Sequence, residues 1–533
     1  MLLHDRKPFF SMNNLPRKTI LFIILVYLAT LFSYHNWTRT KPENRGVIHW
    51  DIISYYAYLP ATFIYGDVKL GFLNNPEFKN DNKFWDVRAE NGNRLIQTSM
   101  GMSFLYAPFF FMAHLLAPVV GEPRDGFGSI YQFFLCLSSL FYFIIGIWVL
   151  SKLLIRYFSP VITSLTLLFI ALGTNLFFYT VFEGPMTHSY NFTMITIFLY
   201  LVIKWYEKPD YLKTSLIGLL FGLIVLVRPT NIFVIFLLLF WGVRNRNDMK
   251  ERFRFFISHL PMVILMAIAF ILVWIPQMAY WKALTGKLFY NGYSSLGGGF
   301  NFDAPHTWKM LFSYRKGWFL YTPIMLIATL GMVLLHRRIK EVFLSVLLYL
   351  VIMVYVLSSW WSWWYGGGFG LRAMVDLYGI MALPLAVTIE WVLKRKILVK
   401  YSLLSLLFFM LYLNVLQSWQ YTKGALHYLG TTKGAYWSNF LRWKYNARHW
   451  SMLSIPDFDL ARKGIYVYYS TGEDFSGIKK ADRNEALNEI KTQILKNKRL
   501  EREMNRYAKK HQVKIDSVIQ MVEEHMYKYK MEH

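Results

Sequence analysis

Long runs of apolar side chains, separated by short polar stretches, dominate the first 420 positions of this chain of 533 residues. The runs cover residues 19–34, 100–120, 129–150, 159–180, 187–204, 214–242, 256–280, 317–335, 342–358, 377–393 and 401–418. A run of about 18 apolar residues is long enough to cross a hydrocarbon core of roughly 30 Å as a helix. A β-barrel would instead show alternating strands of about 10 residues. The pattern predicts an all-α polytopic membrane protein with about 11 to 13 transmembrane helices.

Basic clusters between the runs set the expected topology, because cytoplasmic loops are enriched in Lys and Arg. The clearest clusters lie at 244–254, 336–340 and 394–400. Two topologies fit this pattern. In the first, every run crosses the membrane once. In the second, 214–242 is a pair of short helices broken at VRPTN, and 100–120 does not cross once. We favour the second, because it keeps all basic clusters inside and because Pro229 disfavours helix at Arg228.

The same pattern divides the chain into three regions. Residues 1–18 are expected to form a cytoplasmic N-terminus. Residues 19–418 are expected to form the transmembrane domain, whose first outer loop, 34–99, carries interfacial helices. Residues 419–533 are expected on the exocytoplasmic side as a mostly helical region. From Lys479 onward, charged and apolar residues alternate at helical spacing, which predicts two or three short solvated helices.

Composition narrows the possible partners. Hydrophobic residues make up 55% of the chain and charged residues 17%, whereas an ordinary soluble domain is roughly a quarter charged. The formal net charge of +26 is spread among the loops, which indicates contact with anionic lipid rather than with nucleic acid. The single cysteine, Cys136, lies inside an apolar run, and the sequence shows no Cys/His spacing typical of zinc.

Asp51 opens the aromatic stretch DIISYYAYLPATFIY near the start of the first outer loop. Residues 52–65 fit an amphipathic helix that lies in the membrane interface, where tyrosine rings prefer to sit. Such a helix would hold Asp51 at headgroup level, partly desolvated, which favours the role of a general base. We therefore expect Asp51 to be catalytic and Tyr55, on the same helix, to contact the substrate.

Two further sites place charge in apolar surroundings. Glu183 and His188 flank a Gly-Pro turn in the segment YTVFEGPMTHSYN, on the same side as Asp51 in the favoured topology. Arg228 lies in the middle of a long apolar run, where an arginine costs a few kcal/mol and marks a functional site. Because a guanidinium binds phosphate oxygens in a fork geometry, we expect Arg228 to bind phosphate. The alternative is an arginine that snorkels from a helix break to the interface.

The late motif WWSWWYGGGFGLR combines four tryptophans, a glycine turn and Arg372. It is not a nucleotide-binding glycine loop, because no strand precedes it and the Gly-Lys-Ser/Thr ending is absent. An aromatic belt followed by a glycine turn fits a loop that dips towards a cavity, where Trp364 would contact the sugar and Arg372 the phosphate. Both topologies place three stretches on the outer face, which are 34–99, 282–316 and 358–376.

These features resemble the GT-C superfamily of integral membrane glycosyltransferases, and most closely its branch of protein-O-mannosyltransferases and aminoarabinose transferases. The resemblance covers residues 18–420 and rests on the early Asp51, the LVRPTN break and the WWYGGGFGLR loop. The family commonly carries an acidic pair at the first of these positions, whereas Ile52 follows Asp51 here. A single carboxylate is then left to act alone or with Glu183.

The resemblance implies a mechanism and a set of partners. The donor would be a sugar on a polyprenyl phosphate, and the acceptor a hydroxyl of a glycan, lipid or protein. Asp51 would take the acceptor proton as the hydroxyl attacks the anomeric carbon with inversion, while Arg228 and Arg372 neutralise the leaving phosphate. No cofactor is expected, because family members with such donors generally work without a catalytic metal. Metal-assisted transfer through Asp51 and Glu183 is the alternative.

The resemblance also implies a cellular location, and one other class of function competes with glycosyl transfer. We expect a multi-pass protein of a bacterial inner membrane, with the active site facing the periplasm. A flippase or polymerase for lipid-linked glycans, or a small-molecule transporter, is the alternative. Transporters carry broken helices at matching positions of two halves, and this sequence shows one broken segment and no duplicate. Glycosyl transfer is therefore the preferred hypothesis.

Overall fold

The computed structural model describes residues 14–38, 46–76, 83–293, 297–444, 446–472, 478–479 and 481–532. In these residues the chain is mostly helical, with two small antiparallel sheets, β1 (Val87–Arg88) with β2 (Arg94–Leu95) and β3 (Ser454–Pro456) with β4 (Tyr468–Ser470). The chain forms two compact units. The first comprises Met1–Ser295, Tyr321–Val354 and Leu371–Ser418, and the second comprises Leu296–Leu320, Tyr355–Gly370 and Trp419–His533.

Among the described residues, seven helices are long and apolar enough to cross a membrane. They are α1 (Leu15–Tyr34), α3 (Gly101–Leu116), α4 (Ser129–Leu154), α11 (Leu260–Thr285), α16 (Lys340–Ser358), α17 (Tyr378–Leu393) and α18 (Ile397–Thr422). Three of the apolar stretches include an adjoining 3-10 helix, namely η1 (Asn36–Thr38), η4 (Ala117–Val120) and η7 (Arg372–Leu377). The finding agrees with the predicted all-α membrane protein.

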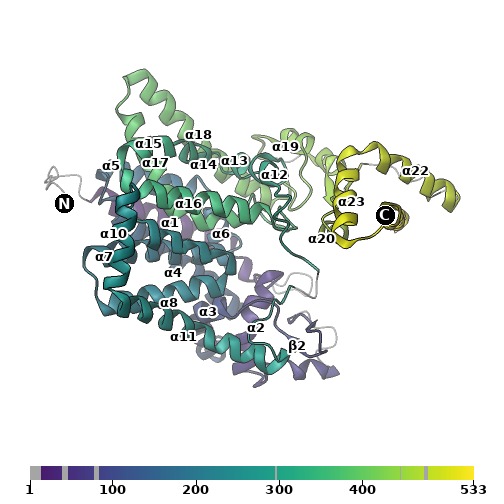
Figure 1. Cartoon of the computed structure of the whole chain (residues 1–533), viewed down its shortest axis with the longest axis horizontal. Coiled ribbons are helices and arrows are strands. Elements are labelled where there is room, and N and C mark those ends of the chain that lie inside the picture. Colours follow the sequence, from purple (N-terminus) through teal and green to yellow (C-terminus); the bar gives the residue numbers. More distant parts are fainter. Residues whose placement is uncertain are drawn as a thin grey trace. The chain divides into compact units, whose positions relative to one another are not determined.

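Further helices complete the first unit (Figure 1). They are α2 (Asp51–Phe63), η2 (Gly71–Asn74), α5 (Pro160–Leu172), α6 (Leu176–Val181), α7 (Thr187–Glu207), α8 (Tyr211–Val227), η5 (Pro229–Val234), α9 (Ile235–Phe240), α10 (Arg246–Ser258), α14 (Pro323–Leu330) and α15 (Met332–Arg338). The predicted break at VRPTN is confirmed, because α8 ends at Val227 and η5 begins at Pro229. Proline cannot donate a backbone hydrogen bond, so the α-helix cannot continue through it unchanged.

Helices α8 and α11 pack closely along each other, as Figure 1 shows. Gly218 and Gly222 lie one turn apart on the face of α8 that touches α11. A Cβ atom added at Gly222 would lie 2.8 Å from the carbonyl oxygen of Phe270, and one at Gly218 would collide with the carbonyl oxygen of Met266. Small residues at this spacing let two helix backbones approach closely, which is the usual basis of helix association in membranes.

We expect Gly222→Leu to destabilise the protein by about 1–3 kcal/mol, because the larger side chain must push α8 away from α11. The midpoint of thermal unfolding, measured on the purified protein in detergent, should fall. Gly299→Ala is the control, since a Cβ added there meets no atom within 4 Å. Equal midpoints for Gly222→Leu and the wild type would contradict the close packing of these helices.

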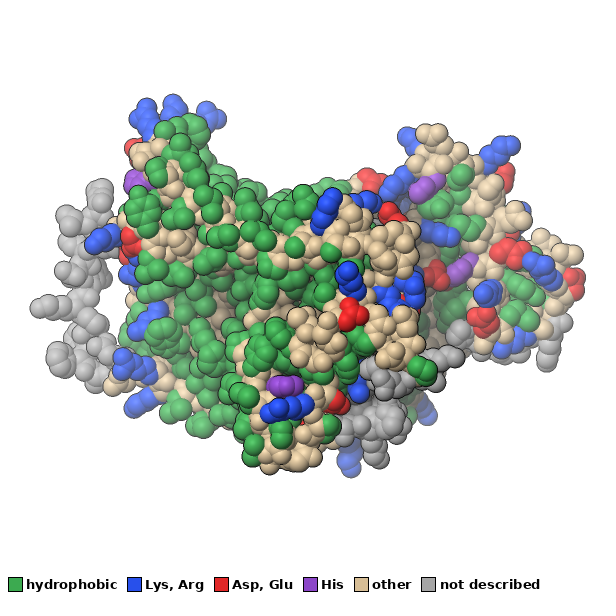
Figure 2. All heavy atoms as spheres, turned by 90° about the horizontal axis from the view of Figure 1, so that it is seen from below, with side chains coloured by type: hydrophobic (Ala, Val, Ile, Leu, Met, Phe, Trp, Pro, Cys, Tyr) green, Lys and Arg blue, Asp and Glu red, His purple; other side chains and the backbone are tan. Residues whose placement is uncertain are grey.

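The outer faces of the long helices are apolar. On α11 the exposed side chains include Ile264, Ile268, Ile271 and Ile275, which recur every three or four residues and so form one stripe. Figure 2 shows hydrophobic side chains over much of one face of the protein. Large contiguous apolar surfaces of this kind mark contact with a membrane or with another protein.

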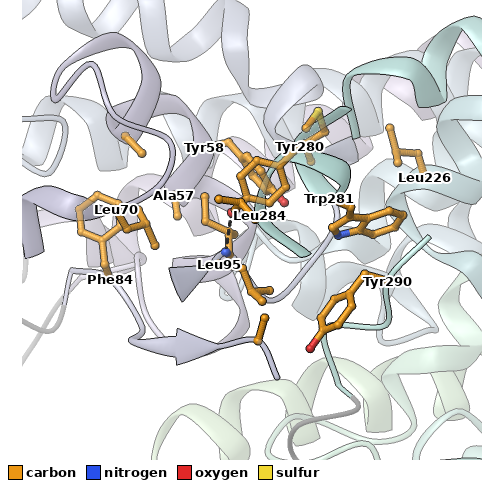
Figure 3. Close-up of a cluster of buried hydrophobic side chains, with 14 residues drawn as sticks. Ala57, Tyr58, Leu70, Phe84, Leu95, Leu226, Tyr280, Trp281, Leu284 and Tyr290 are labelled. Atoms are coloured by element: carbon orange, nitrogen blue, oxygen red, sulfur yellow. Dashed lines mark hydrogen bonds between the residues drawn. The ribbon is translucent and has the colours of Figure 1, made fainter. Parts of the chain in front are cut away.

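A cluster of buried side chains joins the segment between α1 and α3 to the end of α11 (Figure 3). Tyr58 of α2 packs edge-on against Tyr280 of α11, and the Tyr280 hydroxyl accepts a hydrogen bond of 2.8 Å from the backbone N–H of Ile96. Ala57 and Leu284 belong to the same cluster. The cluster fixes α2, and with it the start of that helix, on the rest of the first unit.

The expectation that the tyrosine rings of α2 lie among lipid headgroups is wrong for Tyr56 and Tyr58. Nine of its thirteen residues are buried within the protein, and Tyr56 and Tyr58 donate hydrogen bonds to the carbonyl oxygens of Gly126 and Thr98. Their rings therefore lie in protein rather than among lipid headgroups. The sequence pattern is the same in both cases, because a protein interior with hydroxyl partners and a membrane interface select the same amphipathic aromatic residues.

The second unit contains the predicted helices of the tail. Three of them are observed, α22 (Arg483–Lys496), α23 (Lys498–His511) and α24 (Ile515–Glu532), so the prediction of two or three short helices is confirmed. Their apolar faces bury Ile490, Ile494, Met504 and Val522 in a core of their own. The other described helices that lie mainly in this unit are α12 (Thr307–Phe312), α13 (Trp318–Tyr321), α19 (Lys433–Asn439), η8 (Ala447–Met452) and α20 (Phe458–Arg462).

Candidate active site

Asp51 is the first residue of α2. The chain enters the helix through Trp50, whose φ of 48° and ψ of −133° are rare for a residue with a side chain. The partial positive charge at the amino end of a helix favours a carboxylate there by roughly 0.3–1 kcal/mol. The Asp51 side chain keeps 32% of its surface exposed. A buried helix thus presents this carboxylate where an outside molecule can reach it.

Arg372 is the partner of Asp51. Its Nη2 donates a hydrogen bond of 2.8 Å to Asp51 Oδ2, across 321 positions of the sequence. Arg372 begins η7, which packs against α7. The charge of Glu183 and the phenol of Tyr179 also act on the Arg372 guanidinium, so both lie in its surroundings. The sequence placed Asp51, Glu183 and Arg372 in one site, and the structure brings them into one neighbourhood.

A second ion pair lies at the break after α8. Arg228 Nη1 donates to Asp376 Oδ2 at 3.0 Å. Asp376 is fully buried, and the same oxygen also accepts hydrogen bonds from the side-chain amides of Asn191 and Asn231 at 3.0 and 2.9 Å. Three donors on one oxygen hold this carboxylate rigidly. Asp376 stands four residues after Arg372, so η7 supplies one member of each ion pair.

His188 faces the second pair. Its Nδ1 lies 3.8 Å from Asp376 Oδ1, which is too long for a direct hydrogen bond. The imidazole is 1% exposed and packs edge-on against the Tyr179 ring. His188 therefore lies among the predicted site residues, but behind the carboxylate of Asp376 rather than at an accessible surface.

Two phenols link the ion pairs electrostatically. Burial raises the pKa of Tyr55 and of Tyr293 well above the ordinary value for tyrosine. The charge of Asp51 raises the pKa of both further, whereas the charges of Arg372 and Arg228 lower it. Because each phenol senses all three charged groups, Asp51 and Arg228 share one neighbourhood. At neutral pH both phenols remain hydroxyls that can donate a hydrogen bond.

The two arginines predicted to bind phosphate have partners that the sequence did not predict. Arg228 and Arg372 each already face a carboxylate, because a charge among apolar helices is stable only when it is paired. Sequence reasoning missed Asp376, the counter-ion of Arg228. The signal was present, since Asp376 is an acidic residue at the start of an apolar run. Such a residue is a candidate for a functional or pairing role by default.

Trp364 is a predicted site residue whose side chain the structure shows to be fully buried. It belongs to the second unit, where its ring is fully buried and packs edge-on against the rings of Trp363, Phe458 and Tyr466. A ring covered on this scale has no face left to stack on a sugar. Its expected sugar contact is therefore corrected, and its packing explains why an aromatic residue stands there.

Both aspartates of the site are already engaged by guanidinium groups. Within the described part of the chain, no group of three or more His, Cys, Asp or Glu is placed to hold a metal. Asp51 and Asp376 each face a guanidinium, which competes with any cation for the carboxylate oxygens.

Fold and site together define a class of protein, a helical protein with helices fit to cross a membrane and a cluster of paired charges among them. Comparison of the sequence with protein-family models gives no match, and comparison with curated proteins gives none either.

Proposed function

We propose that the protein is an integral membrane glycosyltransferase, which transfers a sugar from a polyprenyl phosphate to an acceptor hydroxyl with inversion. The observation that carries the proposal is the partly exposed Asp51–Arg372 pair, 2.8 Å apart, in one neighbourhood with the Arg228–Asp376 pair. Together they supply a carboxylate for proton transfer and two guanidinium groups for a phosphate. The acceptor is a glycan, a lipid or a protein, and the site faces the periplasm of a bacterial inner membrane.

The proposed membrane domain has more spans than the seven long helices. The shorter apolar helices are α5, α8 and the stretch formed by η5 and α9. In the favoured topology α8 and the stretch of η5 and α9 are the pair of short helices on either side of the break.

The reaction uses Asp51 as the general base. The acceptor oxygen attacks the anomeric carbon, its proton passes to an Asp51 carboxylate oxygen, and the bond from that carbon to the phosphate oxygen breaks with the electron pair on the phosphate. The hydrogen bond from Arg372 orients the Asp51 carboxylate before the reaction. An arriving lipid phosphate competes with Asp51 for Arg372, which frees the carboxylate for the acceptor at the moment the donor is bound.

Arg228 has a different part in this proposal. Its side chain is 18% exposed, while its partner Asp376 is fully buried. Because its guanidinium is partly exposed and always charged, Arg228 attracts the phosphate electrostatically while it stays paired with Asp376.

The test is an incubation of the purified protein with a panel of radiolabelled polyprenyl-phosphate sugars and extracted membrane acceptors. Transfer of label from the lipid to a water-soluble or protein-bound product supports the proposal. Failure of every donor in the panel to lose its sugar, with folded protein, argues against it.

Transport is the second candidate, because one observation favours it. The helix broken between α8 and α9 places Arg228 at the break, and transporters bind substrates at such discontinuous helices. Uptake of an intact lipid-linked glycan or solute into liposomes, without cleavage of a glycosidic bond, would favour this candidate. The two assays use the same purified protein, so they separate the two functions directly.

A further inference from the structure

Helix α10 lies where two basic clusters of the sequence meet. The backbone N–H of Gly242, just before α10, donates a hydrogen bond of 2.9 Å to the carbonyl oxygen of Glu341. This contact brings the cluster at 244–254 beside the cluster at 336–340. Figure 1 shows α10 near one end of α4 and α8. Basic clusters beside membrane helices face the side of the bilayer that carries anionic lipid.

One face of α10 is fixed on the end of α7. The guanidinium of Arg252 lies 3.6 Å from the centre of the Tyr206 ring and donates to the carbonyl oxygen of Trp241. Phe255, one turn further along α10, packs edge-on against Trp205, with 5.4 Å between the ring centres. A cation over an aromatic ring and a pair of packed rings both stabilise this contact. The opposite face of the helix is therefore held outward.

The outward face of α10 carries an apolar stripe. Met249, Phe253 and Ile257 recur every four residues and are exposed, Phe253 to 67% of its surface. The run of exposed apolar residues continues at Leu260 and Ile264, in the stripe of α11 described above. A helix with an apolar stripe and many basic residues, next to a membrane span, is typical of the membrane interface.

A row of cations runs beside the apolar stripe. Arg246, Lys250 and Arg254 also recur every four residues, and all three are exposed. Within the described part of the chain, none of them forms an ion pair or a side-chain hydrogen bond, not even with Glu251 of the same helix. Like charges four residues apart on a helix repel each other. A negatively charged partner would stabilise this row.

A groove between α9 and α10 combines both features. Its volume is about 520 Å³, within the roughly 300–1,000 Å³ of ordinary ligand pockets. Apolar side chains of both helices line it, among them Leu239, Phe240 and Phe253, and the charged lining consists of Lys250, Arg252 and Arg254. Among the described lining residues there is no carboxylate. The groove thus offers an apolar wall next to two cations that have no partner within the protein.

From this arrangement we infer that the groove between α9 and α10 binds an anionic phospholipid. An acyl chain lies along Leu239, Phe240 and Phe253, and the lipid phosphate accepts hydrogen bonds from Lys250 and Arg254. A soluble anion would leave the apolar wall uncovered, and a neutral lipid would leave the row of cations without a counter-charge. The inference does not rest on sugar transfer, because none of these residues belongs to the Asp51 site.

The test is photo-crosslinking of the purified full-length protein in phosphatidylcholine vesicles. Separate samples contain a trace of phosphatidylglycerol or of phosphatidylcholine with a photoactivatable group on the acyl chain. After digestion with chymotrypsin, mass spectrometry locates the label. Residues 239–256 should carry about tenfold more label from phosphatidylglycerol than from phosphatidylcholine. Equal labelling by the two lipids would overturn the inference. So would an unlabelled segment, the result expected if a second copy of the chain covers the groove.

Variants make the test specific to the groove. Lys250→Gln combined with Arg254→Gln should lower the phosphatidylglycerol label in 239–256 about tenfold and leave the phosphatidylcholine label unchanged. Both side chains are exposed, so the unfolding midpoint should stay at the wild-type value. The matched control is Lys340→Gln combined with Arg337→Gln, which removes two exposed cations of the neighbouring cluster that lie outside the groove lining. An equal loss of label in both double variants would show a general effect of surface charge and overturn the inference.

Discussion

Asp51→Asn should lower the rate of sugar transfer by about 10²–10⁴-fold, the usual contribution of a positioned general base. Asparagine keeps the shape of the side chain and offers Arg372 an oxygen, but it cannot accept the proton of the acceptor hydroxyl at neutral pH. Arg372 is mostly buried and loses its charged partner, so the variant should also lose about 1–3 kcal/mol of stability. The measurement is the initial rate of product formation at saturating donor, with the unfolding midpoint as a check on the fold.

The control for this experiment lies in the same segment, between α1 and α3. Glu90 pairs with Lys287 at 3.1 Å, and both side chains are exposed, so Glu90→Gln should leave the rate and the stability unchanged. If the Asp51→Asn protein folds normally and transfers sugar at the wild-type rate, Asp51 does not take part in the reaction. The same rate loss in both variants would point to a general effect of charge in the loop.

Asp376→Leu should destabilise the protein by roughly 3–5 kcal/mol, the cost of breaking a buried ion pair on one side. The Arg228 guanidinium would lose its counter-ion, and the amides of Asn191 and Asn231 would lose their acceptor. The measurement is the unfolding midpoint of the purified protein, or the yield of folded protein where the variant is too unstable to purify.

A double variant separates the ion pair from the packing around it. Arg228→Leu combined with Asp376→Leu leaves no uncompensated buried charge, so it should recover part of the stability that Asp376→Leu loses. Recovery should be incomplete, because Asn191 and Asn231 still lack an acceptor. A double variant no more stable than the single one would show that the energy lies in the amide hydrogen bonds and not in the charge pair.

The two ion pairs explain how this protein keeps charge among apolar helices. Each arginine is neutralised by an aspartate, and η7 contributes Arg372 to one pair and Asp376 to the other. A ligand that engages Arg372 therefore disturbs the carboxylate at position 51 and the element that carries Asp376. Catalysis and stability are coupled through this one short helix in the proposed function.

The sequence by itself determined the helices, the break and several members of the site. The apolar runs predict helices because every backbone polar group in a membrane needs a partner within its own segment. Pro229 predicts the end of α8, since proline has no N–H to donate. Asp51, Glu183, Arg228 and Arg372 were selected because charge in apolar surroundings is costly and is kept for a reason. These inferences need only local chemistry.

The tertiary structure decided the partners. Asp51 and Arg372 are 321 positions apart, and Arg228 and Asp376 are 148 apart, so no local rule pairs them. The structure also decided that the tyrosines of α2 lie in protein and that Trp364 is covered by other rings. Periodicity shows which side of a helix is apolar, but lipid and protein interior attract the same side chains. Only the packing of the whole chain tells them apart.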